Sequence, residues 1–364
     1  MLKTPLYDIH LALNAKIAPF GGWLMPIQYT GIIQEHNWTR ANAGLFDICH
    51  MGEFVIQAEL AKSNLNDLVT VNLESMPQGA CRYGFMLNQQ GGILDDLLVY
   101  KLSSTQWMIV VNAATTVSDC AYLQKYLTGA TRFENVSASL GKLDLQGPLA
   151  MSVLDKFLGA DITALQYYTF GSFFLLGEKI IISRTGYTGE LGYELYMPNK
   201  KIPELWQKIL NDQRVKPIGL GARDTLRLEM GYSLYGQDID EHTTPLEAGL
   251  KYFIDWNKEF IGKDALLKQK QARVSRRMVY FIADSRRSPR HNYRILHNEE
   301  EIGTVTSGSF SPSLGFGIGM GYVSRDISIG DEIILKDAAV SITAKVVNKP
   351  FYKNGTVKRK APGA

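Results

Sequence analysis

The sequence predicts an α+β protein in which antiparallel strands and helices share the first two-thirds of the chain and an all-β domain follows. Two observations predict this class. Up to about residue 231, β-like runs bounded by turns alternate with helical stretches, whereas beyond residue 275 only short strands recur. A chain of 364 residues, of which 45% are hydrophobic, can also bury the cores of two or three domains.

Helices and strands are expected in a definite order along the first two-thirds. Residues 30–44 predict a helix, with Thr30 as its N-cap and Gly44 as its stop. Pro148 in a first turn, followed by an i, i+4, i+8 apolar stripe, predicts another helix over 146–159. Further helices are expected at about 61–69, 115–127, 203–212 and 222–231, and strands in GEFVIQ, CRYGFML, DDLLVYKL, QWMIVVN, KIIISR and LGYELYM.

The C-terminal part predicts a small β-barrel or a jelly-roll-like domain, built from MVYFIA, EIGTVTSGSF, GIGMGYV, DEIILK and VSITAKVV. GFGIGMG (315–321) resembles a nucleotide-binding loop, but its register is GxGxGxG and it enters a strand rather than a helix. We interpret it as a bulged β segment.

Composition and motifs exclude several classes of protein. No stretch approaches eighteen continuous apolar residues, so a membrane span is not expected, and the N-terminus lacks the pattern of a signal peptide. Cys49, Cys81 and Cys120 are odd in number and widely spaced, which favours a reduced, cytoplasmic chain. The chain contains no CxxC, HExxH or GxxxxGK[ST], so we expect neither a metal nor a bound nucleotide.

Positive charge is concentrated in residues 268–294, where Asp284 is the single acidic residue, although the net charge of the chain is only +3. The segment flanks one apolar strand and lacks the interleaved aromatic residues of a nucleic-acid site. We interpret it as a solvated domain junction, with attraction of an acidic partner as the alternative, and expect no nucleic-acid partner.

The segment SRTGYTGELGYEL (183–195) contains more glycine than a hairpin requires. Period-two alternation puts Gly192, Glu194 and Tyr196 on one face of its strand. A solvent-facing glutamate is one interpretation. In the other, the glycines let the hairpin close over a ligand, and Glu194 accepts two parallel N–H bonds from an amidine-like edge, such as that of a pterin.

Two further pairs of charged residues are candidates for chemistry. Asp95 and Asp96 must face opposite sides of a strand. An acid among Leu, Ile and Val is partly desolvated, which can raise its proton affinity; capping of a turn is the alternative. Arg223 and Arg227 lie one helical turn apart. Both could pair with carboxylates of the fold, or Arg223 could orient a ligand's carboxylate or carbonyl.

Seven motifs occur in an order that closely resembles one family. They are PFGGWLMPIQY, FDICHMGEF, GGILDDLLVY, VVNAA, SRTGYTGELGYEL, GLGARDTLRLEMG and SLYGQDID. Together they are similar to the T-protein, or aminomethyltransferase, of the glycine cleavage system, over nearly the whole chain. One departure is Cys49, where the family commonly has serine.

The resemblance implies a three-lobed molecule that binds tetrahydrofolate as a co-substrate. It implies that the enzyme takes an aminomethyl group from the lipoyl arm of H-protein, its partner, releases ammonia and leaves 5,10-methylenetetrahydrofolate. We expect residues 1–274 to form the folate-binding region as two α+β lobes, with about 52–136 inserted into the other, and residues 275–364 to form the C-terminal barrel.

The resemblance also implies roles for single residues. Asp96 matches the catalytic aspartate, Glu194 the residue that holds the pterin edge, and Arg223 the arginine that assists it. Either Lys353 or Arg359 in the basic tail would meet the glutamate of the folate. The residues expected to line the folate channel are Met51, Tyr83, Asn112, Tyr168 and Tyr187.

Three other functions fit less well. A folate-binding paralogue of iron–sulfur cluster maintenance would carry KGCYxGQ, and this chain has only YGQ. A dimethylglycine- or sarcosine-oxidising enzyme would need a flavin domain with its glycine fingerprint. A nucleic-acid binder would rest on residues 268–294 alone.

Overall fold

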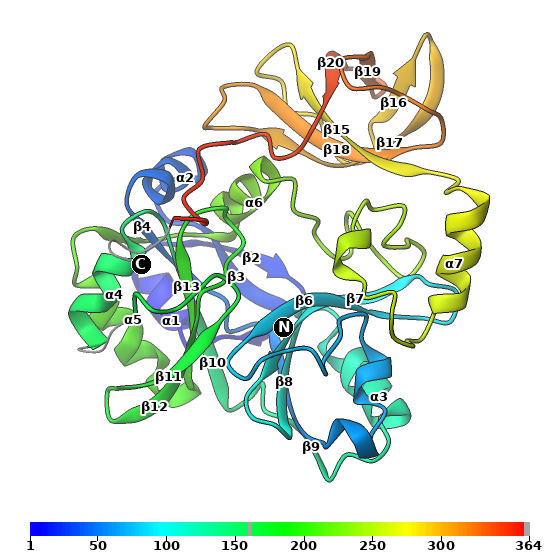
Figure 1. Ribbon diagram of the computed structural model, residues 1–364. Coiled ribbons are helices and arrows are strands. Elements are labelled where there is room, and N and C mark those ends of the chain that lie inside the picture. Colours follow the sequence, from blue (N-terminus) through cyan, green and yellow to red (C-terminus); the bar gives the residue numbers. More distant parts are fainter. Residues whose placement is uncertain (159–161, 360–364) are drawn as a thin grey trace. The chain divides into compact units, whose positions relative to one another are not determined.

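The computed structural model describes residues 1–158 and 162–359, and Figure 1 shows the elements along the chain. The described α-helices are α1 (Tyr7–Ala12), α2 (Ile32–Ala41), α3 (Thr116–Tyr126), α4 (Ala150–Leu158), α5 (Ile202–Leu210), α6 (Leu220–Glu229) and α7 (Lys263–Ala272). Short 3-10 turns lie at η1 (Leu60–Lys62), η2 (Leu65–Leu68), η3 (Asn199–Lys201) and η4 (Lys251–Phe253).

The described strands of the first two-thirds are β1 (Leu2–Lys3), β2 (Lys16–Phe20), β3 (Trp23–Gln28), β4 (Ala43–Asp47), β5 (Gly52–Gln57), β6 (Cys81–Leu87), β7 (Ile93–Lys101), β8 (Gln106–Val111), β9 (Arg132–Asn135), β10 (Leu140–Gln146), β11 (Phe170–Leu175), β12 (Glu178–Ser183), β13 (Gly192–Pro198) and β14 (Val215–Pro217). Those of the last third are β15 (Arg277–Ala283), β16 (Arg294–His297), β17 (Glu300–Phe310), β18 (Gly317–Val323), β19 (Glu332–Lys336) and β20 (Ser341–Val347). The α+β class is confirmed.

The chain divides into two compact units. The first unit comprises Met1–Gly84, Asp96–Arg223 and Gly355–Ala364, and the second comprises Phe85–Asp95 and Asp224–Asn354. The expected division into residues 1–274 and 275–364, with about 52–136 inserted, stays a prediction.

Two sheets that contribute the predicted site residues of the first unit position the candidate site. One has the order β11-β12-β13-β10-β4-β14 and the other the order β6-β7-β8-β5-β9. Helices α4 and α5 pack on the first sheet through an amphipathic face, and the apolar cluster there includes Val153, Leu205 and Trp206. A smaller cluster joins side chains of both sheets: Tyr196 of β13 packs with Tyr100 of β7 and Val110 of β8.

Six strands of the second unit close into the predicted barrel, in the order β15-β18-β17-β16-β19-β20. Because β15 pairs with both β18 and β20, the sheet has no free edge. Alternate residues such as Phe281, Val305 and Leu335 are fully buried and fill the interior. The barrel alternative to a jelly roll is therefore confirmed.

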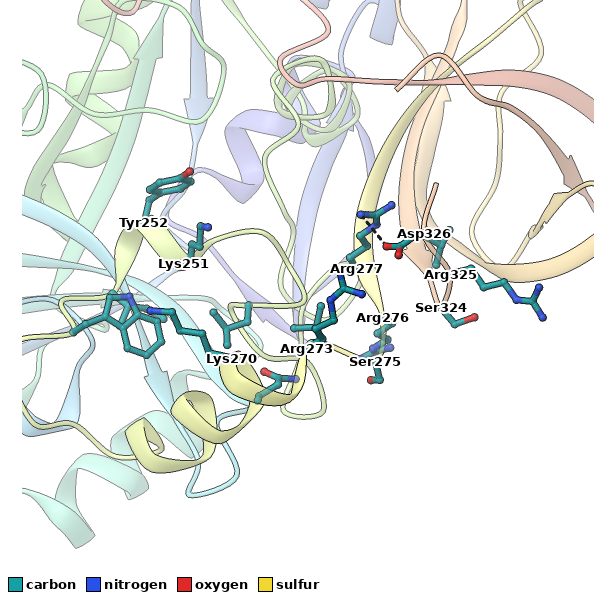
Figure 2. A pocket seen from close by; sticks show the side chains of 16 residues that line it. Lys251, Tyr252, Lys270, Arg273, Ser275, Arg276, Arg277, Ser324, Arg325 and Asp326 are labelled. Carbon is teal, nitrogen blue, oxygen red and sulfur yellow. Dashed lines mark ion pairs between the residues drawn. The ribbon is translucent and has the colours of Figure 1, made fainter. Parts of the chain in front are cut away.

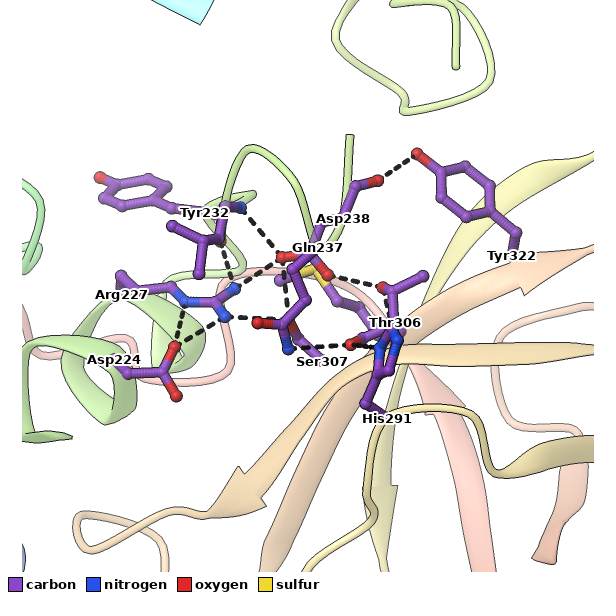
Figure 3. Close-up of polar contacts among 11 residues, drawn as sticks. Asp224, Arg227, Tyr232, Gln237, Asp238, His291, Thr306, Ser307 and Tyr322 are labelled. Carbon is purple, nitrogen blue, oxygen red and sulfur yellow. Dashed lines mark hydrogen bonds and ion pairs between the residues drawn. The ribbon is translucent and has the colours of Figure 1, made fainter. Parts of the chain in front are cut away.

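A network of buried polar groups ties the loop after α6 to the barrel strand β17 (Figure 3). Arg227 and Asp238 form an ion pair at 2.8 Å, with side chains 1% and 0% exposed. The Asp238 carboxylate also accepts hydrogen bonds from the hydroxyls of Thr306 (2.6 Å) and Ser307 (2.9 Å), and from the backbone N–H of Leu234 (2.9 Å). Such a pair is stable only when its remaining hydrogen-bonding sites are filled in this way.

Some expected elements are wrong or shifted. Thr30 does not cap α2; the Glu35 carboxylate instead accepts hydrogen bonds from the backbone N–H groups of Tyr29, Thr30 and Gly31. Gly44 lies in β4, because the helix already ends at Ala41.

The predicted helix at 61–69 forms only the two 3-10 turns η1 and η2. The predicted helix at 146–159 begins at Ala150, because residues 140–146 form β10, and Gly159 lies outside the described residues. The segment 268–294, which we interpreted as a solvated junction, contains regular structure at both ends. Helix α7 extends into its start, and strand β16 begins at its last residue.

The glycines of GFGIGMG serve close packing of strands. The register shift that marks a β-bulge lies in β17, between Val305 and Ser307, rather than in the glycine segment of β18 opposite it. A Cβ on Gly321 would come within 2.3 Å of the Thr304 carbonyl oxygen, and one on Gly319 within 2.8 Å of that of Ser307. Any side chain at these positions would push β17 away.

Candidate active site

Asp96 is held from both sides in the sheet β6-β7-β8-β5-β9. The Tyr83 hydroxyl of β6 donates to one carboxylate oxygen of Asp96 at 2.9 Å. The side-chain amide of Asn112, directly after β8, donates to the other oxygen at 2.8 Å and to the Asp96 carbonyl at 3.1 Å. Asp96 accepts in both side-chain contacts, an arrangement that suits a carboxylate. Three predicted site residues are thus brought together.

Asp95 and Asp96 face opposite sides of β7, as the alternation predicts. The side chain of Asp95 is completely buried, whereas Asp96 is only partly buried and shares its face with Leu98 and Tyr100. Turn capping by this pair is wrong, because both residues lie within the strand.

Glu194 projects from β13 toward Lys142, which lies on the neighbouring strand β10. The two form an ion pair at 2.9 Å, with side chains 6% and 1% exposed. The Tyr196 hydroxyl donates to the same Glu194 oxygen at 3.1 Å. No described residue donates to the other oxygen, Oε1. The interpretation of Glu194 as a solvent-facing residue is therefore wrong.

The glycines around Glu194 make room for a side chain of the protein. A Cβ on Gly186 or Gly192 would lie within 2.2 Å of the Gln146 amide group. That amide donates to Asp144 at 2.6 Å and to the Thr185 carbonyl at 3.0 Å, and it accepts from Thr188 at 2.7 Å. These two glycines thus admit Gln146, and not the ligand that sequence reasoning assigned to the space beside them.

Arg223 and Arg227 bind different carboxylates. Arg223 pairs with Asp144 of β10 at 2.7 Å, and its guanidinium lies over the ring of Tyr187, 5.1 Å from the ring centre. Arg227 pairs with Asp238. Burial raises the pKa of Asp144, although Arg223 opposes the rise. Arg223 therefore couples the Asp144 carboxylate to a predicted channel residue.

The remaining predicted residues connect the groups around Asp96 and Glu194. Burial raises the pKa of Tyr83 well above its usual value, and nearby Asp96, Tyr187 and Tyr168 add to the rise. Met51 receives a contact from the Lys142 ammonium at 3.6 Å. Met51 and Tyr168 also pack on the apolar cluster around Tyr196. All eight predicted site residues thus lie in the first unit, linked by direct or electrostatic contacts.

Sequence reasoning missed Lys142, Asp144 and Gln146, which line one face of β10 opposite Tyr196, Glu194 and Gly192 of β13. The alternation of polar and apolar residues in LGKLDLQ is a signal that could have identified this strand. Two buried neighbours of Met51 were also missed. The pKa of His50 is lowered to about 4 by burial, and neither carboxyl oxygen of Glu53 has a hydrogen-bond partner among the described residues.

The C-terminal tail is attached to the segment that contains Glu194. The Thr356 hydroxyl and backbone N–H both donate to Glu190, which pairs with Arg40 at 2.8 Å. Arg184 donates to the backbone carbonyls of Val357 and Arg359. A folate contact through Lys353 or Arg359 stays a prediction.

The second unit contains a cleft of about 840 Å³, which we call the basic cleft (Figure 2). Arg276, Arg277 and Arg325 pair with Glu247, Asp326 and Glu300. Within the described residues, no carboxylate pairs with the other cations. The positively charged residues that line the cleft are Lys251, Lys270, Arg273, Arg276, Arg277 and Arg325.

Across residues 1–158 and 162–359, no helix is long and apolar enough to cross a membrane. In the same part of the chain, no three His, Cys, Asp or Glu side chains gather as metal ligands would.

Comparison with known families identifies the chain. The family named GCVT N-terminal domain matches residues 6–258, and the Glycine cleavage T-protein C-terminal barrel domain matches residues 276–353. The chain belongs to the glycine cleavage T-protein family. Both matches agree with the resemblance that its motifs show.

Individual relatives of the T-protein family extend over almost the whole chain. An aminomethyltransferase from Halothermothrix orenii is 46% identical and covers 96% of this chain and 100% of its own. One from Thermotoga maritima is 40% identical, with 99% and 100% covered. The crystal structure of glycine cleavage system aminomethyltransferase T from Bartonella henselae has a TM-score of 0.91, with 35% identity and 98% and 99% covered. The chain is therefore an enzyme of the aminomethyltransferase type.

Proposed function

We propose that this T-protein transfers the one-carbon unit of an aminomethyl-lipoyl group, carried by H-protein, to tetrahydrofolate. The products are 5,10-methylenetetrahydrofolate, ammonia and dihydrolipoyl H-protein. The observation that carries the proposal is the presence of two separately fixed carboxylates in the first unit. Asp96 is fixed between Tyr83 and Asn112, and Glu194 is fixed by Lys142 with one oxygen left open.

In the proposed complex, Glu194 binds the amino–amide edge of the pterin. A carboxylate oxygen accepts N–H bonds from an amino–amide edge, and Oε1 is the Glu194 oxygen that remains for them. Lys142 and Tyr196 both bind Oε2 of Glu194, which fixes the side chain before any ligand arrives. Such preorganisation reduces the ordering that binding would otherwise require. Arg223, held by Asp144 beside Tyr187, supports the same pocket.

Asp96 would act on the reacting centre. Tetrahydrofolate already supplies nucleophilic amines, so the protein needs to supply position and electrostatics. The transferred carbon leaves sulfur and ammonia and bonds to two folate nitrogens, whose two protons end on the thiol and the ammonia. A fixed carboxylate can carry a proton between these groups and stabilise positive charge on an iminium-like carbon.

The decisive experiment measures ammonia release from aminomethylated H-protein with and without tetrahydrofolate. We expect rapid release that depends on tetrahydrofolate. Release at the same low rate in both conditions would contradict the proposed reaction.

We expect Glu194→Gln to weaken tetrahydrofolate binding tens- to hundred-fold, because a charge-assisted contact of about 2–3 kcal/mol is lost. From sequence alone, Glu194→Ala would be expected to fold normally. The Lys142 ion pair changes this expectation, because loss of the carboxylate leaves a buried ammonium unpaired. Calorimetric titration measures the affinity, and urea unfolding measures the stability.

The matched control is the double variant Lys142→Met/Glu194→Gln, which removes both charges. It should recover stability relative to Glu194→Gln but not affinity. A double variant that binds tetrahydrofolate as tightly as the parent would show that Glu194 does not read the pterin.

We expect the KM for H-protein to rise with salt. A lipoyl carrier is expected to be acidic, and the basic cleft contains cations that pair with no described carboxylate. Charge attraction should therefore speed the association of H-protein with this protein, and salt should screen that attraction. Steady-state kinetics at low and moderate salt test this. Lys270→Glu/Arg273→Glu should raise the KM and flatten its salt dependence, whereas Lys200→Glu, an exposed lysine of the first unit, should not. A flat KM in the parent would exclude steering.

A further inference from the structure

Glu53 carries a buried carboxyl group that the proposed chemistry does not use. The residue is 1% exposed and lies at the start of β5, and neither of its carboxyl oxygens has a hydrogen-bond partner within the described residues. A buried polar group without a partner is costly, so its retention calls for a reason.

The surroundings of Glu53 are those of the Lys142–Glu194 pair. Glu53 lies two residues after Met51, which directly precedes β5, and two residues before Val55, so strand alternation gives it the same face as both. Met51 and Val55 both pack on the apolar cluster that includes Tyr196. Met51 contacts the Lys142 ammonium at 3.6 Å, and that ammonium lies 5.1 Å from the centre of the Tyr196 ring. Glu53 therefore faces the side of β10 and β13 on which the ion pair forms.

Four titratable groups interact electrostatically with Glu53. They are Lys142 on β10, Glu194 and Tyr196 on β13, and Cys49 in the segment that leads into β5. Lys142 is the only cation among them, and it is already committed to Glu194 at 2.9 Å. An ionised Glu53 would attract Lys142 and repel Glu194.

We infer that Glu53 is a positioning residue of the tetrahydrofolate site. While the Glu53 carboxyl is neutral, Lys142 stays paired with Glu194. When the carboxyl ionises, it draws Lys142 away from Glu194 and weakens the binding of tetrahydrofolate. Glu53 thereby sets the upper pH limit of binding. The inference rests on the proposed function, because it takes Glu194 as the group that reads the pterin.

The sign and size of the effect follow from the carboxyl's titration. Burial raises the pKa of Glu53 to about 8, with Lys142 acting against the rise and Glu194 adding to it. The group is neutral below that pH and ionised above it. The neutral fraction therefore falls from about nine-tenths at about pH 7 to about one-tenth at about pH 9. If only the neutral form binds well, the apparent Kd rises about ten-fold over this range.

The test compares tetrahydrofolate binding by the parent and Glu53→Gln, measured anaerobically by calorimetry between about pH 7 and about pH 9. Glutamine cannot ionise, so the variant should bind like the parent at neutral pH and change its Kd less than about two-fold across the range. Titration of the ligand itself is common to both proteins. Glu59→Gln, which changes an exposed glutamate, should keep the parent's profile.

Two outcomes would overturn the inference: parallel pH profiles for the parent and Glu53→Gln, or an equal loss of affinity at every pH, which would mark a merely structural role. If Glu53→Gln does not fold, infrared spectroscopy of the parent decides. A protonated carboxyl band that disappears with the same midpoint as the rise in Kd supports the inference, and its absence at neutral pH contradicts it. A parent protein that binds no tetrahydrofolate at any pH would instead contradict the proposed function.

Discussion

Asp96→Asn should lower kcat by at least about a hundred-fold, the scale for losing a positioned acid–base group. The substitution keeps the shape of the side chain. Its amide oxygen can still accept from Asn112, and its NH2 group can donate to the Tyr83 hydroxyl oxygen, so the local fold should persist. Tetrahydrofolate should still bind, because Glu194 and Lys142 are untouched. Steady-state kinetics and calorimetry measure the two effects separately.

The matched control is Asp95→Asn, one residue away on the opposite face of β7. Asp95 is completely buried, so this change should act on stability and leave activity per folded molecule within a few-fold of the parent. Thermal melts correct both variants for the folded fraction. Equal losses of kcat would mean that the two acids act as a unit, and a larger loss for Asp95→Asn would show that the other face of the strand carries the chemistry.

Asp238→Ala should lower the free energy of unfolding by about 3–5 kcal/mol, because it leaves the Arg227 guanidinium buried without its main counter-ion. It also removes the acceptor for the Thr306 and Ser307 hydroxyls of β17 (Figure 3). Urea denaturation followed by tryptophan fluorescence measures the loss.

Asp224→Ala provides the matched control, since Asp224 binds the same guanidinium at 2.7 Å but is 46% exposed. An exposed carboxylate contributes about 0–1 kcal/mol, so this variant should unfold close to the parent. The double variant Arg227→Met/Asp238→Leu should regain much of the lost stability, because it removes both buried charges. Similar losses for Asp224→Ala and Asp238→Ala would show that burial of the pair does not control its contribution.

Features that depend on local backbone geometry could be predicted from the sequence. Successive side chains of a strand point to opposite faces, so the faces of Asp96 and Glu194 followed from alternation alone. The strands GEFVIQ and CRYGFML coincide with β5 and β6, because short runs that contain β-branched and aromatic residues favour strands. Loss of helical signals after residue 275 was enough to predict an all-β domain, and the seven motifs were enough to assign the family.

Features that depend on which segments meet were decided only in the tertiary structure. Residues 61–69 carry a helical pattern, yet Asn64 bonds to the Tyr126 carbonyl and the Thr128 N–H, and the segment forms 3-10 turns instead. Helix α2 is capped by Glu35 rather than Thr30, because the helix's own carboxylate can reach three backbone N–H groups.

The candidate site likewise has features that the sequence predicts and features that only the tertiary structure determines. Its residue types could be predicted from the motifs, but the partner of Glu194 could not. Lys142 meets it only because β10 and β13 pair in the register that places Asp144 opposite Glu194. A register shift of one residue would turn Lys142 to the other face and leave Glu194 buried without a cation. Alternation is a property of each strand by itself, whereas the pairing of buried charges is a property of the contact between strands, and only the tertiary structure determines that contact.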